Sequence, residues 1–296
     1  MRIALILRCP PPLSAQPQAA VRSTRQALLY ASGGNGVYYF SYPSGKPLGR
    51  LSGFDKNFNP GGLCIDNAGD VFVTGFLAGE STDVETSQIY EFMHGGTTPI
   101  AKLAEKDVAA GCSVDPTTGD LSVSNYFNKY QDRGSVARFI GARGKPTYYV
   151  YPKTSQFHFC AYDDAGNLFI SRGTNGLEEL PHGETTFQDI TLSNGALASS
   201  VQWRRGELVV SSYVPDSRGP MSLYRTKVSN DTATVVGTTT LSSPPEKDST
   251  GQFWIDGANV AGPIGNHLFV WSYPGGGNPI KRLHALAGWV GVTVSR

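Results

Sequence analysis

Short runs of apolar or alternating apolar and polar residues recur along this chain, and turns rich in Asp and Gly separate them. Residues 62–73, 111–123 and 159–170 each have the pattern of a strand, a turn and a second strand, with weaker copies at 200–210 and 252–256. The first strands of successive copies end at positions 66, 115, 163, 204 and 256, so the spacings are 49, 48, 41 and 52 residues. Spacings of about 40–50 residues are typical of repeats that each form one four-stranded sheet.

A second pattern fills the space between these copies. Residues 35–51, 87–103 and 266–283 each alternate polar and apolar positions, turn at Gly, resume after Pro and end on Leu. This pattern is typical of a hairpin whose Pro begins an outer strand, where the ladder tolerates the missing N–H. The two patterns together predict a series of four-stranded antiparallel units.

The two ends of the repeat region complement each other. Residues 27–32 have the pattern of a second strand without a first, and residues 291–295 have that of a first strand without a second. Placed together they complete one unit, in which Val294 aligns with Ile65 and Val114. Pairing of the ends would remove the exposed sheet edges of an open array. We therefore predict an all-β, six-bladed β-propeller over residues 27–296, with one blade closed by the C-terminal strand joining the N-terminal strands.

The repeat also resembles a known family. The segment Gly-Leu-Cys-Ile-Asp-Asn-Ala-Gly-Asp-Val-Phe-Val at 62–73 is similar to the repeat of NHL-type propellers and of the wider six-bladed TolB-like superfamily. The resemblance covers residues 27–296 and implies the fold. It implies little about activity, because this architecture hosts hydrolases, lyases, receptors and scaffolds.

The composition agrees with an all-β chain and limits the classes of partner that the protein could bind. Gly (35), Pro (19), Tyr (14) and Phe (14) suit short strands and tight turns. The net charge is +1, and no block of Lys and Arg is long enough to neutralise a run of phosphates. No apolar window has the length of a spanning helix. We expect a monomer without a nucleic-acid partner or a membrane span.

The N-terminal residues 1–26 allow two interpretations. The apolar run at 3–7 is shorter than the core of a signal peptide, and Arg8 interrupts it. The segment is either the remnant of a signal peptide whose start lies upstream or a disordered tail. The low charged fraction, 17%, favours export and an extracytoplasmic or secreted protein over a cytoplasmic one.

Three cysteines fall in the repeat region. Cys112 and Cys160 align at the same position of neighbouring innermost strands, and Cys64 lies one residue further along its own strand. A Cys112–Cys160 bridge would need Cα atoms within about 7 Å of each other. We expect all three to pack as small apolar side chains rather than form a bridge or a ligand site.

The candidate ligand-binding residues lie at the predicted mouth of the central channel and on three long loops, at 77–86, 125–134 and 213–219, which all emerge on one face. Aromatic rings there would stack on a sugar or hold a peptide, although packing between blades is the alternative for each. Loops on a rigid scaffold are where binding residues concentrate. The candidates are Phe58, Phe157, His158, Trp254, Trp289, Tyr126, Tyr130, Arg133 and Arg218.

A metal site is the alternative. Six-bladed lactonase-like enzymes hold a divalent cation with Glu, Asn and Asp, and the resemblance offers Asn59 and Asp107, with His158 nearby. The first complete blade does not begin with the expected Glu, and Ca²⁺ needs six or more oxygen ligands. We interpret the recurrent Asp residues of the turns, such as Asp66, Asp115 and Asp163, as turn formers.

Three functional hypotheses remain open. The first is an exported, non-catalytic propeller that binds a glycan, peptide or protein at the long-loop face without a cofactor. The alternative is a metal-dependent, lactonase-like hydrolase or lyase with Ca²⁺ at the channel mouth; a scaffold that exposes blade edges is a third possibility. The sequence contains no nucleophile elbow, phosphate loop or H-E-x-x-H motif that would name a reaction.

Overall fold

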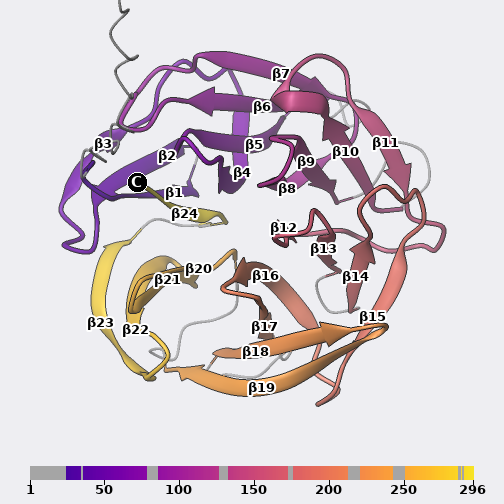
Figure 1. The fold of residues 1–296 in the computed structure, drawn as a ribbon. Coiled ribbons are helices and arrows are strands. Elements are labelled where there is room, and N and C mark those ends of the chain that lie inside the picture. Colours follow the sequence, from indigo (N-terminus) through magenta and orange to yellow (C-terminus); the bar gives the residue numbers. More distant parts are fainter. Residues whose placement is uncertain are drawn as a thin grey trace, which may run out of the picture.

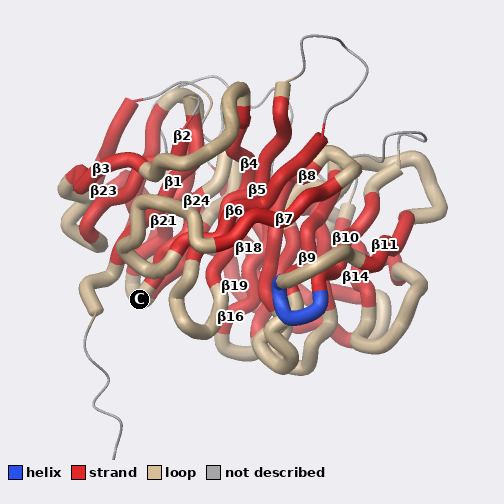
Figure 2. The backbone as a smooth tube through the Cα atoms, turned by 90° about the horizontal axis from the view of Figure 1, so that it is seen from above, coloured by secondary structure: helices blue, strands red, loops and turns tan. Residues whose placement is uncertain are grey.

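A computed structural model describes residues 25–34, 36–78, 86–126, 133–172, 176–212, 221–242, 251–285, 288 and 290–296. The predicted N-terminal segment 1–26 therefore lies almost entirely outside the described residues. The described elements are 24 strands and one 3-10 turn, η1 (Ile140–Ala142) (Figure 2). None of the described helices has the length and apolar character needed to cross a membrane.

The strands form antiparallel four-stranded units that follow one another along the chain and surround a common centre in Figure 1. The innermost strands, in chain order, are β4 (Phe58–Ile65), β8 (Ala109–Val114), β12 (Cys160–Tyr162), β16 (Ala198–Arg204), β20 (Trp254–Asp256) and β24 (Val292–Ser295). The second strands are β1 (Leu28–Gly33), β5 (Val71–Leu77), β9 (Leu121–Asn125), β13 (Leu168–Ser171), β17 (Glu207–Ser212) and β21 (Asn259–Ile264).

Two further strands complete each unit on its outer side. The third strands are β2 (Gly36–Ser41), β6 (Thr86–Phe92), β10 (Ser135–Phe139), β14 (Leu177–Leu180), β18 (Met221–Ser229) and β22 (His267–Ser272). The outermost strands are β3 (Pro47–Arg50), β7 (Ala101–Glu105), β11 (Thr147–Val150), β15 (Gln188–Leu192), β19 (Thr232–Leu241) and β23 (Gly276–Ala285). The predicted strand–turn–strand copies and the three predicted hairpins are confirmed as consecutive antiparallel pairs.

We number the units along the chain, so that the first contains β24, β1, β2 and β3, the second contains β4 to β7, and the sixth contains β20 to β23. The first unit therefore contains strands from both ends of the described chain. β24 pairs with β1 in an antiparallel ladder that runs from Leu28 opposite Ser295 to Ala31 opposite Val292. The predicted joining of the C-terminal strand to the N-terminal strands is therefore confirmed. The last three units are further linked through their outermost strands, by short parallel pairings of β15 with β19 and of β19 with β23.

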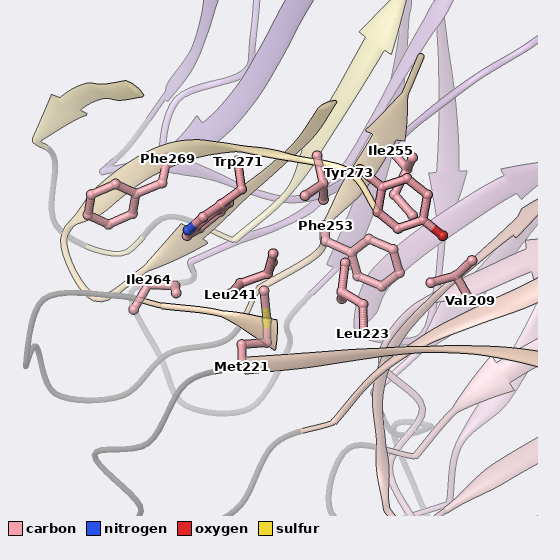
Figure 3. Packing of buried hydrophobic residues seen from close by; sticks show 11 residues of the cluster. Val209, Met221, Leu223, Leu241, Phe253, Ile255, Ile264, Phe269, Trp271 and Tyr273 are labelled. Carbon is pink, nitrogen blue, oxygen red and sulfur yellow. The ribbon is translucent and has the colours of Figure 1, made fainter. Parts of the chain in front are cut away.

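Apolar clusters fill the space between each unit and the next. On β1, Leu28 and Tyr30 pack against the second unit, whereas Leu29 and Ala31 pack against the sixth. This alternation follows from the period of two in a strand, and it explains why both faces of the inner strands are apolar. Figure 3 shows the cluster between the fifth and sixth units, where the buried Trp271 donates its indole N–H to Ser242 O at 2.9 Å.

The expectation that the cysteines only pack as apolar side chains is wrong for two of them. Cys64 on β4 and Cys112 on β8 form a disulfide with Cα atoms 5.6 Å apart, and Cys160 is buried as a free thiol. Cys112 and its equivalent in the second unit, Leu63, both face the preceding unit. Because Cys64 is one residue further along, it faces the following unit and meets Cys112.

This disulfide generates a stability prediction. The bridge closes a loop across a sequence separation of 48 residues, which corresponds to about 4 kcal/mol of loop-closure entropy in the unfolded chain. The double variant Cys64→Ala/Cys112→Ala should lose about that free energy of unfolding in urea titrations. Reductant should destabilise the wild type but not the double variant. Equal stability of the wild type with and without reductant would show that the bridge is absent.

Candidate functional site

The units present two ends to solvent, which we name by the innermost strands. The entry face is where these strands begin, for example at Phe58, and the turn face is where they end, for example at Ile65 before the turn of Asp66. A cavity of about 680 Å³ opens at the entry face between the first and second units. It is lined by Gly36, Arg50, Leu51, Ser52, Gly53, Phe54, Asp55, Asn57, Phe58, Asn59, Pro60 and Ala78.

The segment between β3 and β4 forms one wall of this entry-face cavity, and hydrogen bonds from β6 and β7 hold it in place. The backbone N–H of Asp55 donates to the Tyr90 hydroxyl at 3.0 Å. The Asp55 carboxylate accepts from Gln88 at 2.9 Å and pairs with Lys102 at 3.1 Å. The hydrogen bond from Gln88 and then that from Lys102 lower the pKa of Asp55, so this wall keeps a negative charge.

Aromatic rings form the floor of the same cavity. The half-buried Phe54 stacks on Phe58 with 5.0 Å between ring centres and meets Tyr90 edge-on at 5.1 Å. Phe58 itself is only 6% exposed and belongs to the apolar cluster between the two units. Phe54 is therefore the ring that a ligand would reach first, and sequence reasoning missed it because it lies in a loop outside any strand pattern.

Polar groups surround this floor. Asn57 has a left-handed backbone (φ 65°), which Asn tolerates, and its carbonyl accepts from Ala78 N–H at 3.1 Å and from the Asn59 amide at 3.3 Å. The guanidinium of Arg50 lies 5.7 Å from the ring centre of Tyr38 and close to Gly36, where a Cβ would collide with it. The cavity thus offers one cation, one carboxylate, side-chain amides and an aromatic ring to a polar ligand.

A second group of predicted residues meets near the start of β12. The rings of Tyr126 and His158 lie 4.6 Å apart, and burial lowers the pKa of His158 to about 4, so this imidazole is neutral near pH 7. The backbone of Arg133, just before β10 of the third unit, forms an isolated parallel β-bridge with Ser155, which precedes β12 of the fourth unit. The structure therefore places two of the candidate residues, Tyr126 and His158, side by side.

Two of the predicted ligand-binding residues do not line the entry face. Phe157 is fully buried in the cluster between the third and fourth units, because the Cα of Gly134 leaves room for its ring. Trp254 lies toward the turn face, because β20 has only three residues before its turn at Gly257. There it lines a central cavity of about 210 Å³ that also contains the Cys64–Cys112 disulfide. The predicted residues Tyr130, Arg218 and Trp289, and most of the three long loops, lie outside the described residues.

The two residues of the metal alternative have separate surroundings. Asn59 lines the entry-face cavity and donates to its own segment. Asp107 is 2% exposed, and its carboxylate accepts from the Ser135 hydroxyl at 2.7 Å, which in turn accepts from Asn125 at 3.0 Å. Asn59 and Asp107 therefore lie in different surroundings, and we derive no metal-dependent step.

Asp107 has a buried acidic neighbour that sequence reasoning missed. Glu105 ends β7, is 3% exposed, and accepts the backbone N–H of Asp107 at 2.9 Å. Burial, together with the charge of Asp107, raises the pKa of Glu105 to about 7. No sequence signal separates Glu105 from the exposed acidic residues at other strand ends, because its burial comes from the packing of neighbouring units.

The recurrent Asp residues behave as turn formers. Asp66 accepts the N–H groups of Ala68 and Asp70, and Asp163 accepts those of Ala165 and Asn167, all between 2.8 and 2.9 Å. In the second unit Asp66 and Asp70 also gather with Glu91, and ligand atoms from the three lie within 4.8 Å of one another. Burial raises the pKa of Glu91, and the charge of Asp70 adds to this shift.

Sequence comparisons do not assign the chain to a family. No protein-family model matches it, and no curated protein matches it. The similarity of residues 62–73 to NHL-type repeats therefore rests on the motif itself. Function has to be argued from the cavities and the side chains that line them.

Glu105 makes stability depend on pH. Its pKa is raised from 4.5 to about 7 on folding, so the folded state holds a proton that the unfolded state releases. Through Glu105 alone, the free energy of unfolding should fall by up to about 3 kcal/mol as pH rises from 4.5 to 7. Buried Glu178, whose pKa is raised to about 8, and His158 add pH dependences of their own. The variant Glu105→Gln, which keeps a neutral side chain of the same shape, should differ from the wild type by the loss of the Glu105 contribution.

Urea unfolding at pH 4.5 and pH 8 measures the effect. The exposed Glu184→Gln is the matched control and should follow the wild type. Identical pH profiles for Glu105→Gln and the wild type would contradict a protonated, buried Glu105.

Proposed function

We propose that the protein is a six-bladed β-propeller of the NHL-repeat type that binds a glycan, without catalysis, in the entry-face cavity. The propeller is supported by contacts between successive innermost strands: β24 with β4, β4 with β8, β8 with β12, β12 with β16, and β20 with β24. Between β16 and β20, the amide of Gln202 donates to Ile255 O at 3.2 Å and accepts from Ile255 N at 2.7 Å. Each unit would be one blade.

The observation that carries the binding proposal is the mixed lining of the entry-face cavity. Its volume of about 680 Å³ lies within the usual range for small-molecule sites. An aromatic ring beside amides, a carboxylate and a guanidinium suits a ligand with one apolar face and many hydroxyl groups. A sugar ring has this chemistry, because its C–H face would lie on Phe54 while its hydroxyls bond to Asp55 and Asn59.

The walls of the cavity are held before any ligand arrives. Tyr90, Gln88 and Lys102 fix the Asp55 segment from two strands of the second unit. A site that is ordered in advance loses less conformational entropy when it binds.

An exported location forms part of the proposal. The Cys64–Cys112 disulfide supports it, because structural disulfides persist mainly in oxidising compartments. A secreted or extracytoplasmic protein would meet glycans at cell surfaces or in the surrounding medium.

A glycan array followed by calorimetry tests the function. The wild type should retain a defined set of glycans, and Asn59→Ala and Arg50→Gln should each weaken binding about tenfold or more, because each loses a hydrogen-bonding group from the wall. The control Arg205→Gln changes an exposed arginine at the turn face and should bind like the wild type.

Two results would refute the proposal. One is an array without glycan hits for the folded wild-type chain, in which case a peptide array identifies the other class of ligand. The other is glycan binding that Asn59→Ala and Arg50→Gln leave unchanged while circular dichroism shows both variants to be folded.

A further inference from the structure

A second cavity, of about 460 Å³, lies at the turn face between the fifth and sixth units. Three turns surround it: β16–β17, β20–β21, and the Tyr273–Pro274 turn between β22 and β23. It is lined by Arg204, Arg205, Glu207, Arg225, Gly257, Ala258, Tyr273 and Pro274. We name it the arginine cavity, and it is separate from the entry-face cavity because it lies at the opposite ends of the strands.

Two of its arginines are held in place by their neighbours. Arg204 donates to Gly257 O at 2.8 Å, and its guanidinium carbon lies 5.4 Å from the ring centre of Tyr273. Arg225 lies over Gly237, where a Cβ would collide with its guanidinium, and it faces Glu207 at 3.5 Å. The Gly257 carbonyl and the Tyr273 ring therefore orient Arg204, and Gly237 and Glu207 orient Arg225.

The third arginine reaches the same cavity from a tight turn. Arg205 is exposed and has a left-handed backbone (φ 52°), and Gly206 after it also has a positive φ of 76°. Two successive residues with positive φ are typical of the two-residue turns that join twisted antiparallel strands. This turn places Arg205 directly beside Arg204, so both guanidinium groups belong to one short segment.

The base of the cavity is rigid. Tyr273 is 7% exposed and belongs to the apolar cluster between the fifth and sixth units. Figure 3 shows its ring near Val209 and Ile255, with the hydroxyl directed to the edge of the cluster. Tyr273, whose ring Arg204 contacts, is thus part of the packed core.

The charges of the cavity do not balance. Three guanidinium groups carry +3 and Glu207 carries −1, which leaves +2 in a chain whose total is only +1. Guanidinium groups stay protonated at any physiological pH, so proton loss cannot relieve their mutual repulsion. A concentration of one charge in a hollow lined by protein attracts ions of the opposite sign.

We propose that the arginine cavity binds a phosphate or sulfate monoester. Three guanidinium groups can donate to three oxygens at once, which suits a tetrahedral oxyanion better than a carboxylate with two oxygens. The cavity exceeds the size of a single anion, so the group that carries the ester would occupy the remaining space against Pro274 and Ala258. Phosphate and sulfate share this chemistry, and the experiment separates them.

Isothermal titration calorimetry on the full chain at low salt tests the site. The probes are glucose 6-phosphate, N-acetylglucosamine 6-sulfate, inorganic phosphate, inorganic sulfate and, as a planar comparison, glucuronate. At least one of the two esters should bind more tightly than glucuronate, and sodium chloride should weaken the binding. The tighter ester identifies the oxyanion.

Variants locate the binding. Arg205→Gln, at an exposed turn position, should raise the dissociation constant about tenfold or more, because a charge-assisted hydrogen bond is lost. Glu207→Gln should lower the dissociation constant, because it removes the negative charge of the cavity. Arg143→Gln, at an exposed position outside both cavities, is the matched control and should bind the ester like the wild type.

Three outcomes would overturn the proposal. They are no binding of either ester at millimolar concentration, binding of the inorganic ions or glucuronate in preference to both esters, and ester binding that Arg205→Gln and Glu207→Gln leave unchanged. The sugar esters also fit the entry-face cavity, and Arg50→Gln separates the two sites. Ester binding that Arg50→Gln weakens and Arg205→Gln leaves unchanged belongs to the entry-face cavity and overturns the proposal for the arginine cavity.

Discussion

The pairing of β24 with β1 is the interaction on which the rest of this structure depends. It joins residues from the two ends of the described chain in one ladder, from Leu28 and Ser295 to Ala31 and Val292. Val292 and Val294 also complete the apolar cluster between the sixth and first units. Without this strand, that cluster would be exposed and the first unit would lack its innermost strand. Both large cavities lie between adjacent units, at the first and second and at the fifth and sixth, so their walls depend on how the units are held together.

The innermost strands share a local difficulty, because each has a sheet partner on one side only. Side-chain amides form hydrogen bonds with main-chain groups on the unpaired side of these strands. Gln202 exchanges two hydrogen bonds with the main chain of Ile255, and Gln252 does the same with Leu63 at 2.9 and 2.7 Å. A side-chain amide carries the same donor and acceptor as a peptide group, so it satisfies a buried edge without another strand. The Cys64–Cys112 disulfide adds a covalent link between two neighbouring inner strands at the same centre.

The arrangement of strands could be predicted from the sequence, because a period of two and regular Asp/Gly turns are local signals that survive in one chain. The same period explains the disulfide, since a one-residue offset turns Cys64 toward Cys112. Alignment by equivalent positions considered only a bridge between Cys112 and Cys160, so packing without a bridge was expected. The sequence could not show that Phe157 is buried. An aromatic residue just before a strand gives the same sequence pattern whether its ring faces solvent or packs against the next unit. Glu105 and the arginine cavity were missed because residues from separate units and turns meet there only in the folded chain.

Hydrogen–deuterium exchange of the native chain, read by mass spectrometry at the peptide covering residues 290–296, tests the central pairing most directly. Amides in a ladder exchange only when it opens, whereas those of a free chain end exchange almost at once. The pairing of β24 with β1 predicts that this peptide is protected to the same degree as peptides from β4 and β8. Exchange of 290–296 within seconds, beside protected β4 and β8, would contradict the pairing of the two ends.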